Sequence, residues 1–350
     1  MRIMKPKIIS NLIFAVTAGV LLTGCNKTET AWQNAIRSIE GGDYATAESV
    51  AEAAISAGGG DKLTYRAKGM ALLASGDYQR AIDSFTAALA CSNGIVEQTD
   101  IDISYYLAVA EFKKGDPDGA KMTTDAIVAL RPKDDGAYFL RGKIELALGD
   151  KEAALSDFDK TIELNPENYD RYVGIYEELH SNGFDDDASS YLQKAMTAGN
   201  KLSDYNKGVL EYYLESYTDA RGDLENAKKS GNNENLTLYL GKTYEALGDP
   251  SYAMSLYSEF IRENSSAGRI YEQLANCMMA NGDYEGALDT IESGLSLGNG
   301  EGVKGLMFDR VVAHERLYDF ESAKKDMEEY LSRFPDDEVA KREYVFLSSR

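Results

Sequence analysis

The residue types that most often carry chemistry are few in this 350-residue chain and stand far apart in the sequence. There are two histidines, His180 and His314, and three cysteines, Cys25, Cys91 and Cys277. A bound metal needs several such ligands at short, set spacings, and no such grouping occurs. No glycine-rich phosphate-binding motif occurs either. We therefore predict no metal, no cofactor and no enzyme activity; an enzyme with a site of unfamiliar form is the alternative.

Residues 185–187 are three consecutive aspartates, which could suggest calcium binding. A calcium loop alternates its acids and ends in a distal glutamate, and this run does neither. Acids in series are favoured in the first turn of a helix, where they face the positive end of its dipole. We predict that this run begins a helix.

A repeat supplies the elements that would position any site. Residues 65–88 hold two amphipathic runs separated by Gly76 and Asp77. Glycine suits the left-handed position that ends a helix, and aspartate caps the next helix, so this stretch predicts an antiparallel helix pair. Equivalent turn positions recur at intervals of 32 to 39 residues: Gly42, Gly76, Gly115, Gly149, Gly183, Glu215, Gly248, Gly282 and Tyr318.

Other positions of the repeat agree with this register. Five residues after each turn stands an alanine in all nine repeats, from Ala47 to Ala323. Seventeen residues after each turn stands Gly, Asn, Pro or Ser, residues that end helices. Seven residues before the turn, mostly small residues would let two helices approach closely: Ala35, Gly69, Ala108, Gly142, Tyr176, Gly208, Gly241, Ala275 and Val311.

This pattern resembles the tetratricopeptide-repeat family, which has a 34-residue period. The match is fullest in residues 65–93 and 240–265, where the family's order is followed by Leu240-Gly241, Tyr244, Gly248-Asp249, Ala253 and Tyr257. The resemblance implies an all-α fold, a right-handed superhelical α-solenoid of about nine repeats with a C-terminal capping helix. It also implies a protein that binds partners and has no active site of its own.

We predict one elongated domain, because each repeat contacts mainly its neighbours. Residues 92–100 hold an insertion, predicted to be a longer loop in which Asp100 or Asp102 caps the next helix, and 298–302 are predicted to be a flexible joint. The solenoid spans 28–337, followed by a capping helix in 338–350. The predicted repeats are 28–61, 62–95, 101–134, 135–168, 169–202, 201–234, 234–267, 268–301 and 304–337.

The N-terminus combines a short basic segment with a mostly apolar run over residues 8–22, which is typical of a secretory signal. The run is too short to span a bilayer comfortably. It ends in Leu22-Thr23-Gly24-Cys25, which resembles the lipobox of bacterial lipoproteins. The resemblance implies a signal peptide in 1–24, palmitate or a similar acyl chain on Cys25, and a short tether in 25–30. The alternative is a cysteine that stands near an ordinary cleavage site by chance.

Such a lipoprotein would sit on the extracytoplasmic side of the cell membrane or the outer membrane. Asn26 is not the aspartate that retains some lipoproteins at the inner membrane, which favours the outer membrane in a double-membrane host. Without its signal the chain would carry 34 basic and 58 acidic residues, a net charge of −24. This charge disfavours nucleic acid and anionic lipid as partners. It either attracts a cationic partner or keeps the surface soluble, and we favour solubility. We expect Cys91 and Cys277 to be buried and not to form a disulfide.

In the family the first helix of each repeat lines the concave face. One column on that face lies ten residues before each turn and is rich in aromatic residues, which are favoured anchors at interfaces. This column reads Trp32, Arg66, Tyr105, Phe139, Val173, Tyr205, Leu238, Glu272 and Phe308. We predict that partners contact Trp32, Arg66, Tyr105, Phe139, Tyr205 and Phe308; the alternative is that these residues pack between adjacent first helices.

Some members of the family clamp a C-terminal carboxylate with Lys and Asn. The equivalent positions here lack the asparagines, so a carboxylate clamp is not predicted: Arg66, Met70, Val109, Lys143 and Glu177. We predict a membrane-anchored scaffold or adaptor for extracytoplasmic proteins. The alternative is a lipoprotein that captures a peptide or a glycan.

Overall fold

The structure is a computed structural model that describes residues 30–198, 202–297, 302–335 and 337–350. Within these ranges all the regular secondary structure is helical and no strand occurs, so the predicted all-α class is confirmed. The helices are α2 (Ala31–Glu40), α3 (Tyr44–Ala54), α4 (Lys62–Ser75), α5 (Tyr78–Ala90), α6 (Gln98–Lys114), α7 (Pro117–Leu130), α8 (Asp135–Ala147), α9 (Lys151–Leu164), α10 (Tyr169–Ser181), α11 (Asp185–Thr197), α12 (Asp204–Tyr213), α13 (Tyr217–Ser230), α14 (Glu234–Ala246), α15 (Pro250–Glu263), α16 (Gly268–Ala280), α17 (Tyr284–Leu295), α18 (Val303–Arg316), α19 (Phe320–Arg333) and α20 (Glu338–Leu347). A π-helical turn, η1 (Ile55–Gly59), extends α3.

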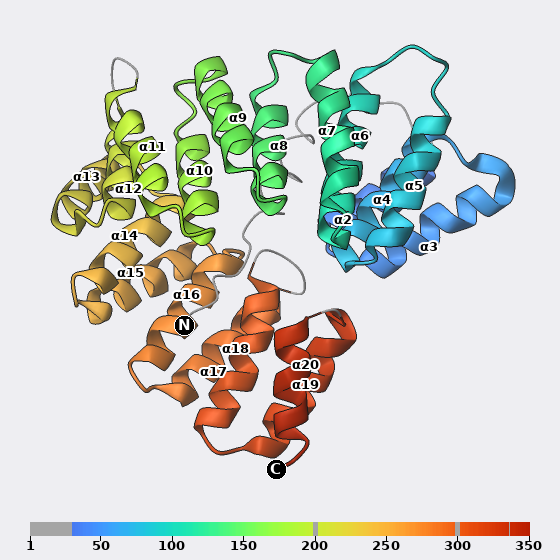
Figure 1. Ribbon diagram of the computed structural model, residues 1–350. Coiled ribbons are helices and arrows are strands. Elements are labelled where there is room, and N and C mark those ends of the chain that lie inside the picture. Colours follow the sequence, from blue (N-terminus) through green and yellow to red (C-terminus); the bar gives the residue numbers. More distant parts are fainter. Residues whose placement is uncertain (1–29, 199–201, 298–301, 336) are drawn as a thin grey trace.

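The helices form successive antiparallel pairs that follow one another in an arc, from α2 and α3 to α18 and α19, with α20 packed on the last pair (Figure 1). Each second helix packs on the first helix of its own pair and on that of the next. In most neighbouring pairs the first helices also contact one another, as α14 contacts α16 and α16 contacts α18. The first helices therefore form the shorter, inner side of the curve. We call their solvent-facing side the inner face.

All nine turn positions adopt the left-handed backbone conformation, including the two that lack glycine. Glu215 has φ 60° and Tyr318 has φ 61°, next to values of 68° to 88° at the seven glycines. Around Gly76 the amide of Asp77 donates to the carbonyl of Leu72 at 2.9 Å, which closes α4. The Asp77 carboxylate then accepts from the amide of Arg80 and begins α5. The same backbone hydrogen bond closes all nine turns, with or without glycine. The aspartate cap is absent from two of them, where Phe184 and Ser216 stand at the cap position and make no side-chain cap hydrogen bond.

In repeats two, four, six and seven a glycine of the first helix faces a large side chain of the second. A Cβ added to Gly69 would lie 2.5 Å from the ring of Phe85, and one added to Gly241 would lie 2.3 Å from the ring of Tyr257. The alanine five residues after each turn is fully buried in all nine repeats. Close helix packing therefore explains both columns of the sequence pattern.

Repeat five departs from this pairing. Tyr176 occupies the small-residue position of α10 and is only half-buried, while the neighbouring Ile175 is fully buried. Gly174 leaves room for Phe139 of repeat four, because a Cβ at this position would lie 2.9 Å from that ring. The large residue is accommodated by facing the inner side of the curve and not the second helix.

Two local predictions are wrong. Neither Asp100 nor Asp102 is the cap of α6: the helix begins earlier, at Gln98, with Glu97 as its cap. The Asp100 carboxylate instead accepts from the Glu97 amide at 2.8 Å, one half of a capping box. Cys91 is exposed, because it lies just after the last residue of α5, where the chain leaves the helix pair.

Other local predictions are confirmed. Cys277 is buried, and neither it nor Cys91 forms a disulfide. The three aspartates of 185–187 make up the first turn of α11. The signal segment with Cys25, and residues 298–301 of the predicted joint, lie outside the described residues.

Candidate functional site

The six predicted partner-binding residues all lie on first helices along the inner face, and all are half-buried. They occupy α2, α4, α6, α8, α12 and α18: Trp32, Arg66, Tyr105, Phe139, Tyr205 and Phe308. Two other members of the same column, Val173 and Leu238, are 8% and 6% exposed and offer little surface to a partner. Each of these six side chains is therefore partly exposed, so that a partner could contact it, and partly packed against the rest of the protein.

Most of these residues contact the next repeat. The guanidinium of Arg66 lies 5.5 Å from the ring centre of Tyr106, and that of Arg171 lies 4.8 Å from the ring centre of Phe139. The ring of Tyr205 meets the ring of Tyr239 edge-on, with 6.5 Å between centres. Arg66, Phe139 and Tyr205 therefore pack against the neighbouring repeat, and contact with a partner stays a prediction for all six residues. Any partner would bind to side chains that the fold already holds in place.

Lys143, which stands at one of the clamp positions, is buried and forms an ion pair within the protein. Lys143 on α8 is 4% exposed, and its ammonium lies 2.9 Å from the carboxylate of Glu178 on α10. Burial lowers the pKa of Lys143, and the positive charge of Lys113 lowers it further, whereas Glu178 raises it. This lysine therefore ties repeats four and five together and is not available to a ligand carboxylate.

Six tyrosines of repeats five to seven form a cluster that we did not predict from the sequence. We call it the tyrosine cluster: Tyr176, Tyr205, Tyr212, Tyr213, Tyr217 and Tyr239, all half-buried. Neighbouring rings stand with centres 5.4 to 6.5 Å apart, mostly edge to face. The Tyr213 hydroxyl lies 2.6 Å from the Glu177 carboxylate, to which it donates, and 3.2 Å from the Tyr239 hydroxyl.

Burial is the main influence on the tyrosine cluster, and nearby acids add to it. The pKa of Tyr205 rises to about 12, through burial and then Asp170, and that of Tyr212 rises to about 12 as well. Burial raises the pKa of Tyr213 far above its usual value, with Tyr239 and Glu177 contributing. The hydroxyls therefore stay protonated at neutral pH and act as neutral hydrogen-bonding groups.

The repeat register could have pointed to the tyrosine cluster. Tyr212 and Tyr213 stand three and two residues before a turn, and Tyr239 stands nine before the next. These are separate columns, and the curvature of the solenoid decides whether they meet. The sequence of a single repeat does not determine that curvature, because it results from the packing of successive repeats.

Buried carboxylates form a second set of perturbed groups, between the helices of a pair. Glu211 on α12 is 6% exposed and shares Lys207 with Asp223 of α13, at 3.3 Å and 2.7 Å respectively. Burial and the neighbouring Asp223 raise the pKa of Glu211 to about 7, although Lys207 opposes the rise. The site lies in the interior of repeat six and serves packing.

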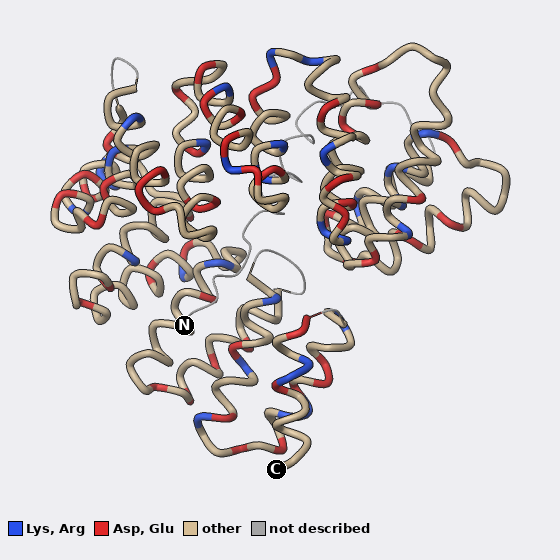
Figure 2. Tube along the Cα trace, viewed as in Figure 1, with Lys and Arg blue, Asp and Glu red and all other residues tan. Residues whose placement is uncertain are grey.

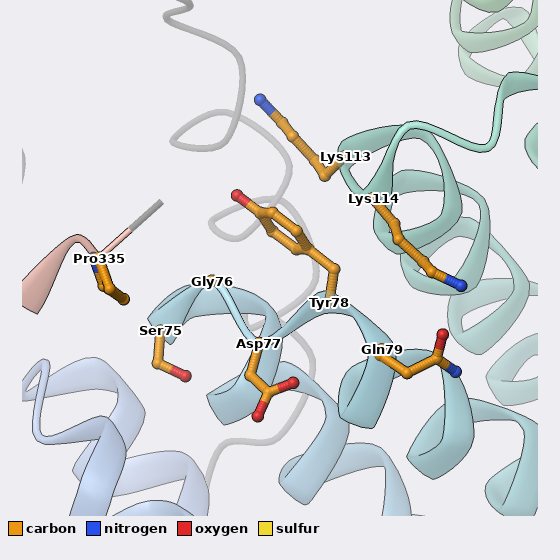
Figure 3. Close-up of a pocket in the computed structure, with 8 residues that line it drawn as sticks. All are labelled: Ser75, Gly76, Asp77, Tyr78, Gln79, Lys113, Lys114 and Pro335. Atoms are coloured by element: carbon orange, nitrogen blue, oxygen red, sulfur yellow. The ribbon is translucent and has the colours of Figure 1, made fainter. Parts of the chain in front are cut away.

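A pocket of about 530 Å³ lies where distant parts of the chain meet (Figure 3). Its lining comes from the turn between α4 and α5, the end of α6, and Pro335 ahead of α20. The side chains of Lys113 and Tyr78 extend toward the same space, as Figure 3 shows. Burial lowers the pKa of Lys113, and Lys304 of the last repeat adds to this effect. The arc therefore brings its last repeat close to repeats two and three.

Acidic residues are distributed along the whole solenoid, with basic residues between them (Figure 2). Among the described residues no group of three His, Cys, Asp or Glu is placed to hold a metal ion. None of the helices in the described part of the chain has the length and apolar character needed to cross a membrane.

Comparisons with known proteins agree with this architecture. Three tetratricopeptide-repeat family models match residues 35–94, 72–144 and 135–168. A curated relative, the DnaJ homolog subfamily C member 7 homolog of Schizosaccharomyces pombe, is 24% identical over 234 residues. That match covers 65% of this chain and 44% of the relative, so the chain spans less than half of that protein's length.

Solved structures of other proteins are similar to this chain. A tetratricopeptide-repeat protein from Parabacteroides merdae is 18% identical, covers 83% of this chain and 99% of its own, and has a TM-score of 0.47. MamA from Desulfovibrio magneticus is 22% identical over 47% of this chain and 92% of its own, with a TM-score of 0.41.

The family models match the repeats whose turns and helix pairs are described above. Repeats of this kind form surfaces that bind peptides or proteins, and they are typically found in non-catalytic scaffolds. Residues 35–168 of this chain are tetratricopeptide repeats, and the later helix pairs continue the same turns and packing.

Proposed function

We propose that this protein is a membrane-anchored, extracytoplasmic scaffold that binds partner proteins through its inner face. The observation that carries the binding part is the set of half-buried aromatic side chains on the first helices, together with Tyr217 at the start of α13. Aromatic side chains held rigidly by their neighbours lose little entropy on binding and bury a large area. A surface of this kind is suited to a protein or peptide.

The anchoring part rests on the sequence Leu22-Thr23-Gly24-Cys25 after an apolar signal segment. A single acyl chain gives only weak, reversible membrane binding, whereas two chains hold a protein almost permanently. A diacylated Cys25 would leave only residues 26–30 before α2 begins at Ala31. The first repeat would then work close to the lipid surface.

Lipid labelling tests the anchor. Cys25→Ala should abolish incorporation of labelled palmitate and release the protein from the membrane fraction. Cys91→Ala is the matched control, because Cys91 is an exposed thiol elsewhere in the chain. Labelling that persists in Cys25→Ala, or that is lost in Cys91→Ala, would contradict the assignment.

Site-specific crosslinking in intact cells tests the scaffold. A photo-crosslinking amino acid in place of Phe139 should capture a defined envelope protein, because Phe139 is half-buried on the inner face. The same amino acid in place of Tyr252 is the control, since Tyr252 is 46% exposed on the second helix α15. Equal capture at both positions, or none at either, would refute binding through the inner face.

The capture of a small peptide or a glycan is the second candidate, and the same aromatic surface favours it. A capture protein should show a rise in melting temperature with oligosaccharides or short peptides, which Tyr205→Ala would abolish. A scaffold should show no such rise with glycans and should give protein crosslinks only.

A further inference from the structure

The tyrosine cluster has an unusual electrostatic environment. Elsewhere in the described chain, aromatic rings commonly carry a Lys or Arg of the same protein, such as Arg66 at Tyr106 and Lys194 at Tyr191. No Lys or Arg of the described residues lies over any ring of the tyrosine cluster. His180 stacks on Tyr176, with ring centres 5.4 Å apart.

Carboxylates lie near these rings. Five acidic residues lie close enough to raise the pKa of at least one tyrosine of the cluster: Asp170, Glu177, Asp185, Glu215 and Glu245. The guanidinium of Arg269 has the opposite effect and lowers the pKa of Tyr205, but it already lies 3.2 Å from the carboxylate of Glu234. The negative potential of the acids therefore adds to that of the ring faces.

Three of the five acids are already hydrogen-bonded. Glu177 accepts from Tyr213, Asp185 lies 2.5 Å from His180, and Glu245 accepts from Tyr257. Asp170 and Glu215 are exposed and have no side-chain partner among the described residues. They stand at the start of α10 and at the turn after α12, and so flank the tyrosine cluster with unpaired charge.

We propose that the tyrosine cluster binds a basic segment of a partner protein, with Arg or Lys side chains on the exposed parts of the tyrosine rings and beside Asp170 and Glu215. This inference rests on the proposed function and specifies the chemistry of its partner. Cations are attracted to aromatic faces, and Arg more than Lys, because its planar guanidinium also stacks. The cluster spans three repeats, which suits a peptide segment better than a single small cation.

Fluorescence anisotropy with the full-length chain tests the proposal directly. The probes are short fluorescein-labelled peptides of alternating Arg-Ala, Lys-Ala and Glu-Ala. The Arg-Ala peptide should bind most tightly, the Lys-Ala peptide more weakly, and the Glu-Ala peptide not measurably. Equal binding of the Glu-Ala peptide, or no binding of either basic peptide, would overturn the proposal.

A net charge of −21 would attract any basic peptide non-specifically, so the variants must separate location from charge. Asp170→Asn with Glu215→Gln should weaken Arg-Ala binding at least about threefold, as expected for loss of two favourable contacts with a cation. Asp118→Asn with Glu152→Gln removes the same charge from exposed residues in the first turns of α7 and α9. This control should bind as the parent does; an equal loss in both double variants would show non-specific attraction and refute the site.

A second pair of variants tests the rings. Tyr212→Leu with Tyr217→Leu should weaken Arg-Ala binding at least about threefold, whereas Tyr252→Leu on α15 should leave it unchanged. Circular dichroism confirms folding of each variant, and the acid variants keep the test decisive if the tyrosine variants unfold. If basic peptides do not bind but Phe139 crosslinks still identify a partner, the scaffold function stands and this inference falls.

Discussion

The close approach of α14 and α15 makes a sharp prediction about a single methyl group. Gly241 faces Tyr257, whose ring is fully buried and whose hydroxyl donates to Glu245 at 2.7 Å. A Cβ at Gly241 would lie 2.3 Å from this ring, so the ring would have to move by about 1 Å to restore ordinary contact. Overpacking of this kind costs about 1–3 kcal/mol, while the gain in helix propensity returns up to about 1 kcal/mol. We expect Gly241→Ala to destabilise the protein by about 1–2 kcal/mol.

The chain offers a matched control in Gly222, which lies in α13 with no atom within 4 Å of an added Cβ. Gly222→Ala should stabilise the protein by about 0.5–1 kcal/mol, through helix propensity alone. Urea unfolding followed by circular dichroism measures both variants against the parent, through the shift of the transition midpoint. If both substitutions stabilise the protein alike, α14 and α15 are not as close as the structure places them.

A double variant tests whether the cost at Gly241 comes from Tyr257. Repeat eight already uses a different pair at the equivalent positions, Ala275 with Ile291, and both are fully buried. Gly241→Ala combined with Tyr257→Ile should therefore lose less stability than the sum of the two single variants, because the residues are in contact. Simple additivity would mean that the loss arises elsewhere.

Three further predictions concern turns, caps and a buried acid. Glu215→Gly and Tyr318→Gly should each stabilise the protein by about 1 kcal/mol in urea unfolding, because both positions have positive φ; a loss of stability would argue against that backbone. Asp77→Ala should cost about 1 kcal/mol, because its carboxylate caps α5; an unchanged midpoint would argue against the cap. The pKa of Glu211 is raised to about 7, so the folded state holds a proton there that the unfolded chain releases near pH 4.5, and stability from this group is lost as the pH rises through 7. Glu211→Gln should therefore raise stability at pH 8 by up to about 3 kcal/mol and little at pH 4, and an equal effect at both would refute the shift.

The sequence determined the helix pair and its repetition, because these depend on residues close together in the chain. The turn needs a residue with positive φ, and in most repeats an aspartate then caps the next helix; both stand within a few residues, as at Gly76 and Asp77. The buried alanines and the small residues of the first helices record close packing within one pair. Even Glu215 and Tyr318 follow the register, since their neighbours fix the turn around them.

Relations between repeats were decided only by the tertiary structure. The sequence placed Lys143 in a clamp position, but its ammonium is buried against Glu178 of the next repeat. The tyrosine cluster joins residues from different columns, because the curve of the solenoid turns α10, α12 and α14 toward one another. That curve is the accumulated result of how each pair packs on the next, including the large Tyr176 at a position for small residues. A repeat pattern specifies each pair separately, whereas the surface that meets a partner is a property of their sum.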